Sequence, residues 1–545
     1  MKKYMFLILI GFVLGCGKEK DAADLLVYNG TIYTVDKDFS TVEAMVIKDG
    51  KIFDLGNRNR LEEKYQFDEK YDANDKVIFP GFLDAHAHLY GLGLSLQSVD
   101  LVGTSSYEEV LTRVKDFQVK HELDYITGRG WNQNAWKNKE FPTKDKLDSL
   151  FPDTPVALTR IDGHALLVNS KALERAGIKA ETKVKGGEVL LENGQPSGVL
   201  IDNAMELVRI TIPKPSREMS ARALLEAEEV AVSLGLTTVD DAGLDREIIE
   251  LIDSLQQVGK MKLRVYAMVS NTPENLDYYL NKGTYKTDRL NLRSFKIYTD
   301  GALGSRGAAM RKPYSDRPDH KGLMITPPDS LEYLANRIAK SDFQMNSHAI
   351  GDSATIAVLR SYQKALKRQK DRRWRVEHAQ IISPEGFDYF TENHNVLASV
   401  QPTHATSDMY WAEDRIGAKR MKGAYAYKSL LDKSGVLPLG TDFPVEQVNP
   451  MYTFYATVVR KDLDHWPEDG FQMKDALSRE EALRGMTIWA AYANFEEEEK
   501  GSLTVGKLAD FTVLDKDIMK VEEQELPNTE VIATFIGGEQ VYEKE

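Results

Sequence analysis

Cysteine is nearly absent from this chain of 545 residues, which contains a single one, Cys16. A disulfide needs two thiols, so no internal disulfide is expected, and the rest of the chain offers no thiolate for a metal ion. An excess of basic charge is also lacking, because 84 acidic residues outnumber 70 basic ones and the formal net charge at pH 7 is −14. This excess of acidic side chains argues against nucleic acid as a partner. With 42% hydrophobic and 28% charged residues, the composition is that of an ordinary globular protein.

The N-terminus lacks a hydrophobic run long enough to span a bilayer. Its apolar stretch covers residues 4–15, whereas a membrane-spanning helix needs about 20 residues. Two lysines precede the stretch, a pattern typical of a signal peptide. VLGC, residues 13–16, resembles a bacterial lipobox, which implies removal of residues 1–15 and acylation of Cys16. The expected product is an exported lipoprotein, anchored to a membrane on the periplasmic side or at the cell surface; the alternative is an uncleaved leader with an incidental cysteine.

Both ends of the remaining chain alternate polar and apolar residues, as short β-strands do. LLVYNGTIYTVD and AMVIKDGKIFDLG lie within residues 22–80, where NG and DG supply hairpin turns. GSLTVGKLADFTVLDKD and VIATFIGGEQVYEKE, within residues 498–545, follow the same pattern. These segments predict a small discontinuous β-sandwich domain built from 22–80 and 498–545.

Residues 81–497 alternate short apolar stretches with helical ones such as SREMSARALLEAEEVAVSLG, in which apolar residues recur every three to four positions. The candidate strands are, in chain order, FLDAHAH, LTTVDDAG, KLRVYAMVS, LRSFKIYTDG, FQMNSHAIGD, RWRVEHAQ, NVLASVQPTH and GVLPLGTDFP. Eight strands, most of them followed by a helix or a long loop, predict an α/β fold, a (β/α)8 barrel of the TIM type. A doubly wound sheet is the competing fold, but no GxGxxG turn follows any of these strands.

Residues 90–234 interrupt the alternation. They contain the extra strands ITGRGW and PVALTRIDGH, and a hairpin, GGEVLLENGQPSGVLI, that turns at NG. We therefore expect an insertion after the first barrel strand, placed where it can act as a lid over the pocket.

Five of the ten histidines lie near the ends of predicted barrel strands. They are His86, His88, His348, His378 and His404. His86 and His88 are two positions apart in GFLDAHAHLY, so their side chains share one face of a strand. Asp442 ends the eighth candidate strand. Because the carboxyl ends of the strands build the active site of such a barrel, these side chains can surround one point, although the pair His86 and His88 alone would suit a protein surface equally well.

Nine segments follow one another from about residue 24 to the C-terminus. They are FPGFLDAHAHL, TRIDGHALLVNSKAL, GLTTVDDAG, FKIYTDGALGSRGAAM, SHAIGDSAT, RVEHAQ, SVQPTH, LGTDFPVEQVNPM and GKLADFTVLD. Together they resemble the amidohydrolase superfamily, and specifically the amidohydrolase family 3 group that includes N-substituted formamide deformylases. The resemblance covers essentially the whole chain after the leader.

The resemblance implies a metal site and assigns its ligands, with Asp442 also shuttling protons. The implied ligands are His86, His88, His348, His378 and Asp442. Lys296 occupies the position where many relatives have a carboxylated lysine that bridges two metal ions. Imidazole and carboxylate ligands suit zinc, so we expect one divalent ion, or two if Lys296 is carboxylated. The alternative is an ordinary lysine that pairs with Asp300 or Asp241.

Four more residues are expected to meet a small-molecule substrate. His164, in the insertion, matches a family motif and would help to hold the carbonyl group or the leaving group as a catalytic residue; a structural histidine is equally open. Trp131, Arg306 and His404 are candidate substrate contacts. Arg306 could instead be an ion-paired surface residue.

The predicted function is metal-dependent hydrolysis of a non-peptide C–N bond of the amide or N-substituted formamide type. Zinc lowers the pKa of its bound water to about 7, and Asp442 would take the proton of that water and deliver it to the departing nitrogen. The same site could support deamination, ester hydrolysis or isomerisation, because barrels change reactions through their loops. A surface lipoprotein that binds a ligand without catalysis is the third possibility. The sequence leaves the actual substrate and the oligomeric state open.

Overall fold

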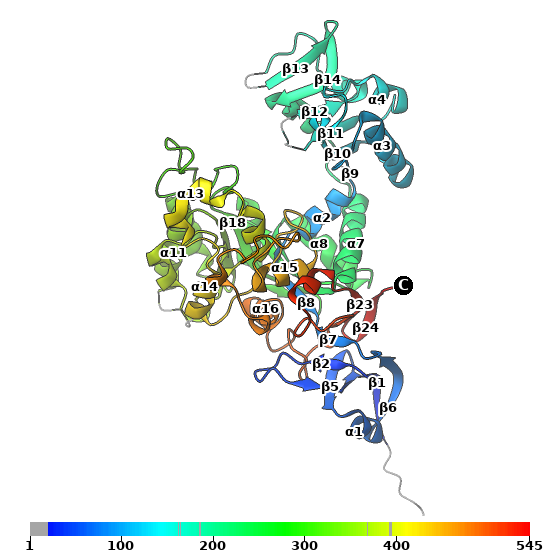
Figure 1. Ribbon diagram of the computed structural model, residues 1–545, viewed down its shortest axis with the longest axis vertical. Coiled ribbons are helices and arrows are strands. Elements are labelled where there is room, and N and C mark those ends of the chain that lie inside the picture. Colours follow the sequence, from blue (N-terminus) through cyan, green and yellow to red (C-terminus); the bar gives the residue numbers. More distant parts are fainter. Residues whose placement is uncertain (1–19, 162, 164, 185–186, 368, 392–394) are drawn as a thin grey trace, which may run out of the picture.

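The structure, a computed structural model, describes residues 20–545 except 162, 164, 185–186, 368 and 392–394. The predicted leader and Cys16 therefore lie outside the described residues. Figure 1 shows a central α/β body, a β-rich region at the bottom and a separate lobe at the top. Within the described part of the chain, no helix has the length and hydrophobicity to cross a membrane.

Seven parallel strands of the described chain form the central sheet, each beside the next in sequence order. They are β8 (Phe82–Ala87), β15 (Leu236–Leu244), β16 (Arg264–Ser270), β18 (Leu290–Tyr298), β19 (Gln344–Ala349), β20 (Trp374–His378) and β21 (Val396–Ser399). Most of their residues are buried, and Val, Ile, Phe and Tyr are common among them, as expected for strands covered on both faces. A short strand, β17 (Tyr285–Lys286), pairs antiparallel with β18.

The eighth predicted strand is corrected by the structure. Residues 435–444, all of them described, contain no regular strand. They still pass between β21 and β8: Gly440 N donates to Val400 O (3.0 Å) and Ala85 N donates to Leu439 O (3.1 Å). Pro438 has no N–H to donate, so a regular hydrogen-bond ladder cannot form through it. The sheet is consistent with a TIM-like barrel that this irregular segment closes, and we call residues 437–443 the closing segment.

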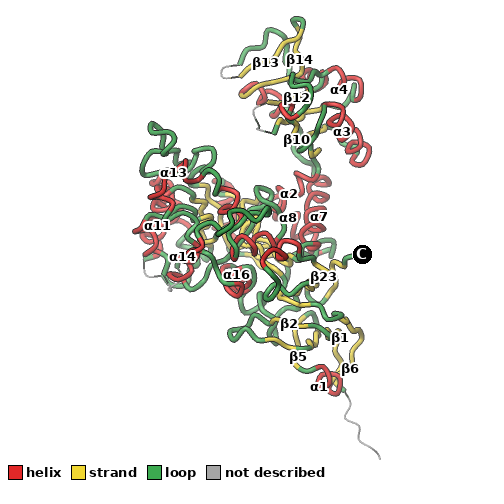
Figure 2. The backbone as a smooth tube through the Cα atoms, viewed as in Figure 1, coloured by secondary structure: helices red, strands yellow, loops and turns green. Residues whose placement is uncertain are grey.

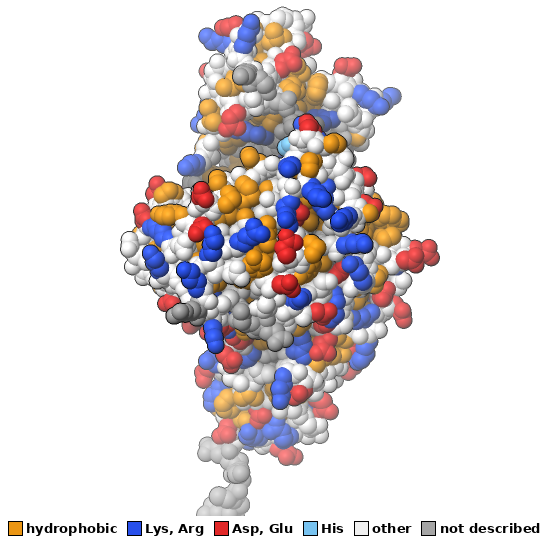
Figure 3. All heavy atoms as spheres, turned by 90° about the vertical axis from the view of Figure 1, so that its left-hand side faces the viewer, with side chains coloured by type: hydrophobic (Ala, Val, Ile, Leu, Met, Phe, Trp, Pro, Cys, Tyr) orange, Lys and Arg blue, Asp and Glu red, His pale blue; other side chains and the backbone are white. Residues whose placement is uncertain are grey.

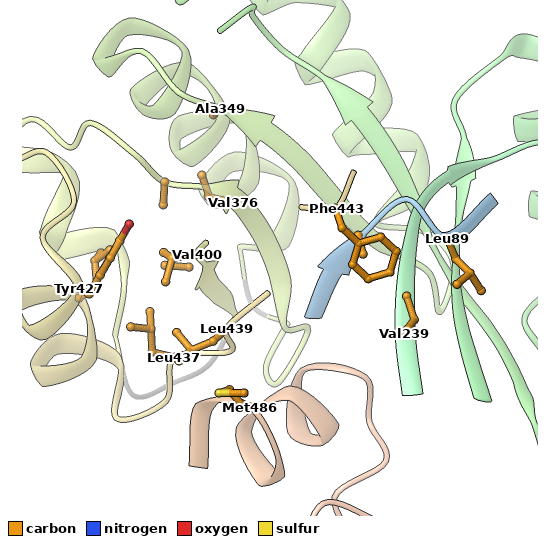
Figure 4. Packing of buried hydrophobic residues seen from close by; sticks show 14 of the residues in the cluster. Leu89, Val239, Ala349, Val376, Val400, Tyr427, Leu437, Leu439, Phe443 and Met486 are labelled. Atoms are coloured by element: carbon orange, nitrogen blue, oxygen red, sulfur yellow. The ribbon is translucent and has the colours of Figure 1, made fainter. Parts of the chain in front are cut away.

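Helices cover the outside of the barrel. The main ones are α7 (Arg217–Ser233), α8 (Arg246–Gln257), α9 (Pro273–Lys282), α10 (Pro328–Ile338), α11 (Asp352–Leu366), α14 (Tyr427–Ser434) and α16 (Arg479–Gly485). In α8, Ile249, Ile252 and Leu255 are buried at a spacing of three residues, which places them on one face of the helix. Figure 4 shows Val400 and Leu439, from the barrel itself, near Met486, which directly follows α16. All three residues belong to the main hydrophobic cluster.

Strands from both ends of the chain share one sheet of six strands among the described residues. Its order is β24 (Glu539–Glu543), β23 (Val531–Ile536), β22 (Phe511–Leu514), β7 (Val77–Pro80), β2 (Thr31–Tyr33) and β3 (Thr41–Val42). A second sheet has the order β5 (Lys51–Gly56), β4 (Ala44–Lys48), β1 (Asp21–Tyr28) and β6 (Tyr65–Asp72). One apolar cluster contains Val27 and Ile47 of the second sheet together with Ile78, Val513 and Phe535 of the first, so the two sheets have a common core.

The lobe at the top of Figure 1 contains a sheet with the order β13 (Gly187–Glu192), β14 (Gln195–Asp202), β12 (Ala165–Val168), β11 (Val156–Arg160), β10 (Ile126–Trp131) and β9 (Val99–Asp100). It also has its own helices, α3 (Tyr107–His121), α4 (Asp145–Leu150) and α5 (Ser170–Arg175), and its own apolar cores. Figure 2 shows that the lobe projects from the barrel beyond α2 (Leu89–Leu96) and α7. These two helices pack closely on each other: a Cβ at Gly93 would lie 2.0 Å from Ala223 O, so glycine is required there.

Candidate functional site

Three buried side chains meet where the barrel strands end. They are His86 of β8, His378 of β20 and Asp442 of the closing segment, and one ligand atom from each lies within 4.8 Å of the others. His86 Nε2 is 3.6 Å from Asp442 Oδ1, and the rings of His86 and His378 are 4.9 Å apart between centroids. Two imidazoles and a carboxylate that converge in this way form a donor set suited to a divalent metal ion.

Four further residues of the predicted site surround these three. Lys296 Nζ lies 2.9 Å from His86 Nε2, and His88 Nε2 lies 3.3 Å from Asp442 Oδ1. His404 Nε2 is 3.6 Å from Asp442 Oδ2. The ring of His348 lies 4.5 Å from that of His378. The structure therefore brings together seven residues that lie as far apart in the sequence as positions 86 and 442.

The backbone at the strand ends aims two of these side chains. His378 has a φ of 70° and Asp442 a φ of 65°, in the left-handed region that non-glycine residues seldom adopt. Such residues occur where surrounding contacts hold them, often at functional sites. Asp84 of β8 fixes the backbone beside Asp442. Its carboxylate accepts hydrogen bonds from N (3.0 Å) and Oγ1 (2.6 Å) of Thr441, the residue before Asp442.

Burial sets the charge of the histidines. It lowers the pKa of His348 to about 3 and lowers the pKa values of His86 and His378 well below the usual value. These imidazoles are neutral at pH 7 and keep a lone pair for a metal ion. Burial opposes the ionisation of Asp442, but His88 beside it and the neighbouring imidazoles hold its pKa well below the ordinary range. The centre therefore combines neutral nitrogen donors with an anionic oxygen donor.

Unpartnered polar atoms give an independent test of whether these residues fit a metal ion. Four buried atoms make no hydrogen bond to any residue that the structure describes: His348 Nε2, His378 Nδ1, His404 Nε2 and Asp442 Oδ1. Each such atom in a protein interior costs about 1–3 kcal/mol. A cation can satisfy several of them at once, so the donor set fits a divalent metal.

Glu377 orients His86 and was not predicted from the sequence. His86 Nδ1 and Glu377 Oε2 are 2.6 Å apart, and both side chains are fully buried. This hydrogen bond uses one ring nitrogen and leaves Nε2 to face the cluster, the arrangement in which a carboxylate supports a metal-binding histidine. The sequence signal was available, because Glu377 is an acidic residue directly before His378 in a predicted barrel strand, which the structure shows as the fully buried β20.

A cavity of about 370 Å³ adjoins the cluster. His88, Lys296, His348, His378, His404 and Asp442 lie in its wall, together with Tyr298, Leu303, Ile350, Gln380, Asp408, Trp411 and Glu446. The size is within the range of small-molecule sites. Motif reasoning missed Asp408, Trp411 and Glu446, because they come from the region after β21 and from the loop after the closing segment, where no regular pattern marks a wall residue.

The structure places three sequence-based expectations about the substrate site away from this cavity. Trp131 lies fully buried in the lobe core, where its indole N–H donates to Leu158 O (2.7 Å), so its ring faces no cavity. Arg306 is ion-paired with Asp316 (2.7 Å) and is absent from the cavity wall. None of the described residues that line the cavity comes from the lobe. His164 lies outside the described residues, and its role stays a prediction.

Lys296 does not form the ion pair considered as its alternative. Asp300 instead accepts backbone hydrogen bonds from Ala309, Ile350 and Gly351 at 2.8–3.1 Å. Asp241 accepts one from Tyr90 N (3.0 Å). Within the part of the chain that the structure describes, the nearest polar partner of Lys296 Nζ is therefore His86.

The fold and the site together define a class, a protein with a TIM-like barrel and a cluster of side chains suited to a divalent metal ion. Residues 69–542 match the family model described as "Amidohydrolase family". The chain therefore belongs to the amidohydrolase family.

Similar proteins cover nearly the whole chain. "Protein LONG AFTER FAR-RED 3" of Arabidopsis thaliana is 34% identical over 95% of this chain and 92% of its own, and "Putative amidohydrolase YtcJ" of Bacillus subtilis is 32% identical over 95% and 99%. "N-substituted formamide deformylase" of Arthrobacter pascens is 26% identical over 96% and 98%. The crystal structure of an uncharacterized metal-dependent hydrolase from Pyrococcus furiosus aligns with a TM-score of 0.77 and 29% identity, over 91% of this chain and 100% of that one.

The role of Glu377 leads to a prediction about metal affinity. Glu377→Gln should weaken metal binding about 10- to 100-fold, because the amide is a poorer acceptor for His86 and no longer fixes its ring. Competition with a chromophoric chelator measures this affinity. Glu385→Gln is the matched control, since Glu385 is an exposed residue that pairs with Arg311. Equal affinity in the Glu377 variant and the wild type would show that His86 needs no such support.

Proposed function

We propose that this protein is a metal-dependent hydrolase that cleaves a non-peptide C–N bond in a small amide or N-substituted formamide. The observation that carries the proposal is the convergence of His86, His378 and Asp442, with unpartnered donor atoms, beside a cavity of about 370 Å³. The formamide deformylase among the relatives supports the substrate class.

The ligands of the proposed centre follow from the contacts. His86, His378 and Asp442 would hold a divalent metal ion, which we propose is zinc, with His88 and His348 completing the set. When bound, such an ion polarises a carbonyl oxygen as a Lewis acid and makes water more acidic. The ammonium of Lys296 has no lone pair for a metal, whereas a carbamate on Nζ would offer two oxygens beside His86. Carboxylation of Lys296, with a second ion, is part of the proposal.

Asp442 is the proposed carrier of the proton. Its carboxylate lies in the wall of the cavity, between His88 on the Oδ1 side and His404 on the Oδ2 side. In hydrolysis of an amide, this group takes a proton from the attacking water and returns it to the nitrogen as the C–N bond breaks. His404 lies in the same wall, and its proposed role is to contact the substrate and not to replace the acid.

A substrate screen with metal control tests the proposal. The zinc-loaded protein is assayed against matched N-formyl, N-acetyl and ester compounds, and bound zinc is counted per chain. We expect turnover of the formyl or acetyl amides, loss of turnover with dipicolinate and its return with zinc. Turnover confined to esters, or turnover that survives complete removal of metal, would contradict the proposal.

We also propose that the protein is exported and anchored through acylated Cys16. The support is the sequence alone, with its lysines, short apolar run and VLGC. Cell fractionation tests this: the wild type is expected with membranes, and the Cys16→Ala variant is not expected to carry lipid. An unmodified Cys16 in the mass spectrum of the membrane-bound protein would overturn it.

A further inference from the structure

A second and larger cavity, of about 920 Å³, lies on the outside of the barrel. Its wall comes from the start of α11, from η3 (Pro384–Tyr389) and the loop before it, from the end of α13 (Ala412–Met421) and from α14. It has no lining residue in common with the cavity beside the metal cluster. The two cavities are close, because Ile381 N, in the outer wall, donates to the carbonyl oxygen of Ile350, in the inner wall (3.1 Å).

Positive charge dominates the wall of this outer cavity. Six basic residues line it, Arg311, Lys312, Lys419, Arg420, Lys422 and Lys433, against the acidic residues Asp352 and Asp388. Asp388 pairs with Lys433 (2.8 Å), and Asp352 accepts a hydrogen bond from the backbone N–H of Arg311 (2.8 Å) while its charge acts on Arg420. This excess of positive charge is confined to the cavity, because the chain as a whole has a formal net charge of −14.

Four of the six cations form no ion pair with any other residue that the structure describes. Arg420 donates to the carbonyl oxygens of Lys312 (3.0 Å), Pro313 (2.9 Å) and Ile416 (2.5 Å), which fixes its guanidinium without neutralising it. Lys312, Lys419, Arg420 and Lys422 form no ion pair with any residue in the described ranges. Because the six cations of the wall outnumber its two acids, an anion in the cavity would meet a net positive field.

The cavity also has an apolar side. Ile381, Ile382, Pro384 and Phe387 contribute to its wall. Figure 3 shows the face that carries α11, α13 and α14, where Lys and Arg side chains lie around hydrophobic ones. A volume of about 920 Å³ is far larger than an inorganic ion needs and matches that of organic-ligand sites.

We propose that the outer cavity is a second ligand site that binds an amphipathic anion, a small molecule with a carboxylate or phosphate head and an aliphatic or aromatic body. The unpaired cations receive the head, and the side formed by Ile381, Ile382, Pro384 and Phe387 receives the body. Charge selects against cationic ligands, and the apolar wall selects against small inorganic ions. The site is independent of the proposed hydrolase reaction.

Calorimetry on the zinc-loaded protein tests the proposal with three probes: octyl phosphate, octylammonium and inorganic phosphate. Octyl phosphate is expected to bind about tenfold or more tightly than either of the others, because it alone combines an anionic head with an apolar body. A factor of ten in affinity corresponds to about 1.4 kcal/mol. The double variant Lys419→Glu with Lys422→Glu should weaken octyl phosphate about tenfold or more. The milder pair Lys419→Gln with Lys422→Gln should weaken it less.

Lys340→Glu is the matched control, because Lys340 is an exposed lysine at the end of α10 and outside both cavities. It should leave the affinity for octyl phosphate unchanged. An unchanged affinity in the double variant would place the probe elsewhere, for example at the metal cluster, and would overturn the proposal. Equal binding of octylammonium, or of inorganic phosphate, would overturn it as well. The Tm of each variant verifies that the fold is intact.

Discussion

Asp442→Asn should lower kcat for the substrate found in the screen by about 10²- to 10⁴-fold, the usual contribution of a general acid–base group. Asparagine keeps the size of the side chain and an oxygen toward the cluster, but it cannot take up and return a proton. Asp442 is only 6% exposed and its carboxylate lies among His86, His88 and His404. The other acids of the cavity wall, Asp408 and Glu446, accept hydrogen bonds from Gln380 and Ser407 instead. The measurement is kcat at saturating zinc, with bound metal determined in the same samples.

Asp414→Asn is the control for this prediction. Asp414 lies on exposed α13, and its substitution removes the same charge outside both cavities. It should retain the wild-type kcat. A metal-loaded Asp442→Asn protein with wild-type turnover would remove Asp442 from the mechanism, whereas a protein that binds no metal would show that Asp442 acts mainly as a ligand.

Asp240→Asn should lower the free energy of unfolding by about 3–5 kcal/mol, the cost of breaking a buried ion pair from one side. Asp240 Oδ2 lies 2.8 Å from the guanidinium of Arg375, and both side chains are fully buried. Asn494 Nδ2 donates to Asp240 Oδ1 (2.7 Å), and Arg375 also donates to Ala85 O (3.1 Å). Neutral asparagine removes the nearer counter-charge of Arg375 and leaves only Glu377, 4.0 Å away and already bonded to His86, in the centre of the barrel.

Urea unfolding with two further variants checks this prediction. Glu332→Gln breaks the exposed pair with Lys364 and should cost less than about 1 kcal/mol. The double variant Asp240→Leu with Arg375→Met should lose less stability than Asp240→Asn, because it buries no unpaired charge. A loss below about 1 kcal/mol in Asp240→Asn would show that water or another group reaches Arg375.

The hydrogen bonds and ion pair of Arg375 also link the strands that carry the residues of the proposed metal site. Arg375 contacts Asp240 of β15 and the backbone of β8, and its neighbour two positions on, Glu377, binds His86. The strand that supplies His378 therefore also supplies the group that orients His86. Substitutions in this network are expected to affect metal affinity as well as stability.

The sequence determined the strands and most of the cluster by itself. A strand has a period of two residues, so His86 and His88 were placed on one face, and apolar runs ending in His348 and His378 marked strand ends. The run ending in Asp442 marked the closing segment, although that segment is not a regular strand. These signals are local, and the barrel makes local signals sufficient, because the carboxyl ends of all its strands lie on one side. The resemblance to the amidohydrolases, which the family match confirms, rested on the same strand ends.

Only the tertiary structure decided which side chains support or line the site. Glu377 binds His86 across 291 positions of the chain, and Arg375 meets Asp240 across 135, distances at which no residue pattern links the partners. Trp131 and Arg306 were assigned to the substrate because of their chemistry, but their backbones place them in the lobe core and in an ion pair. A side chain's function depends on which surface its element faces after packing, and packing is set by contacts that the local sequence does not contain.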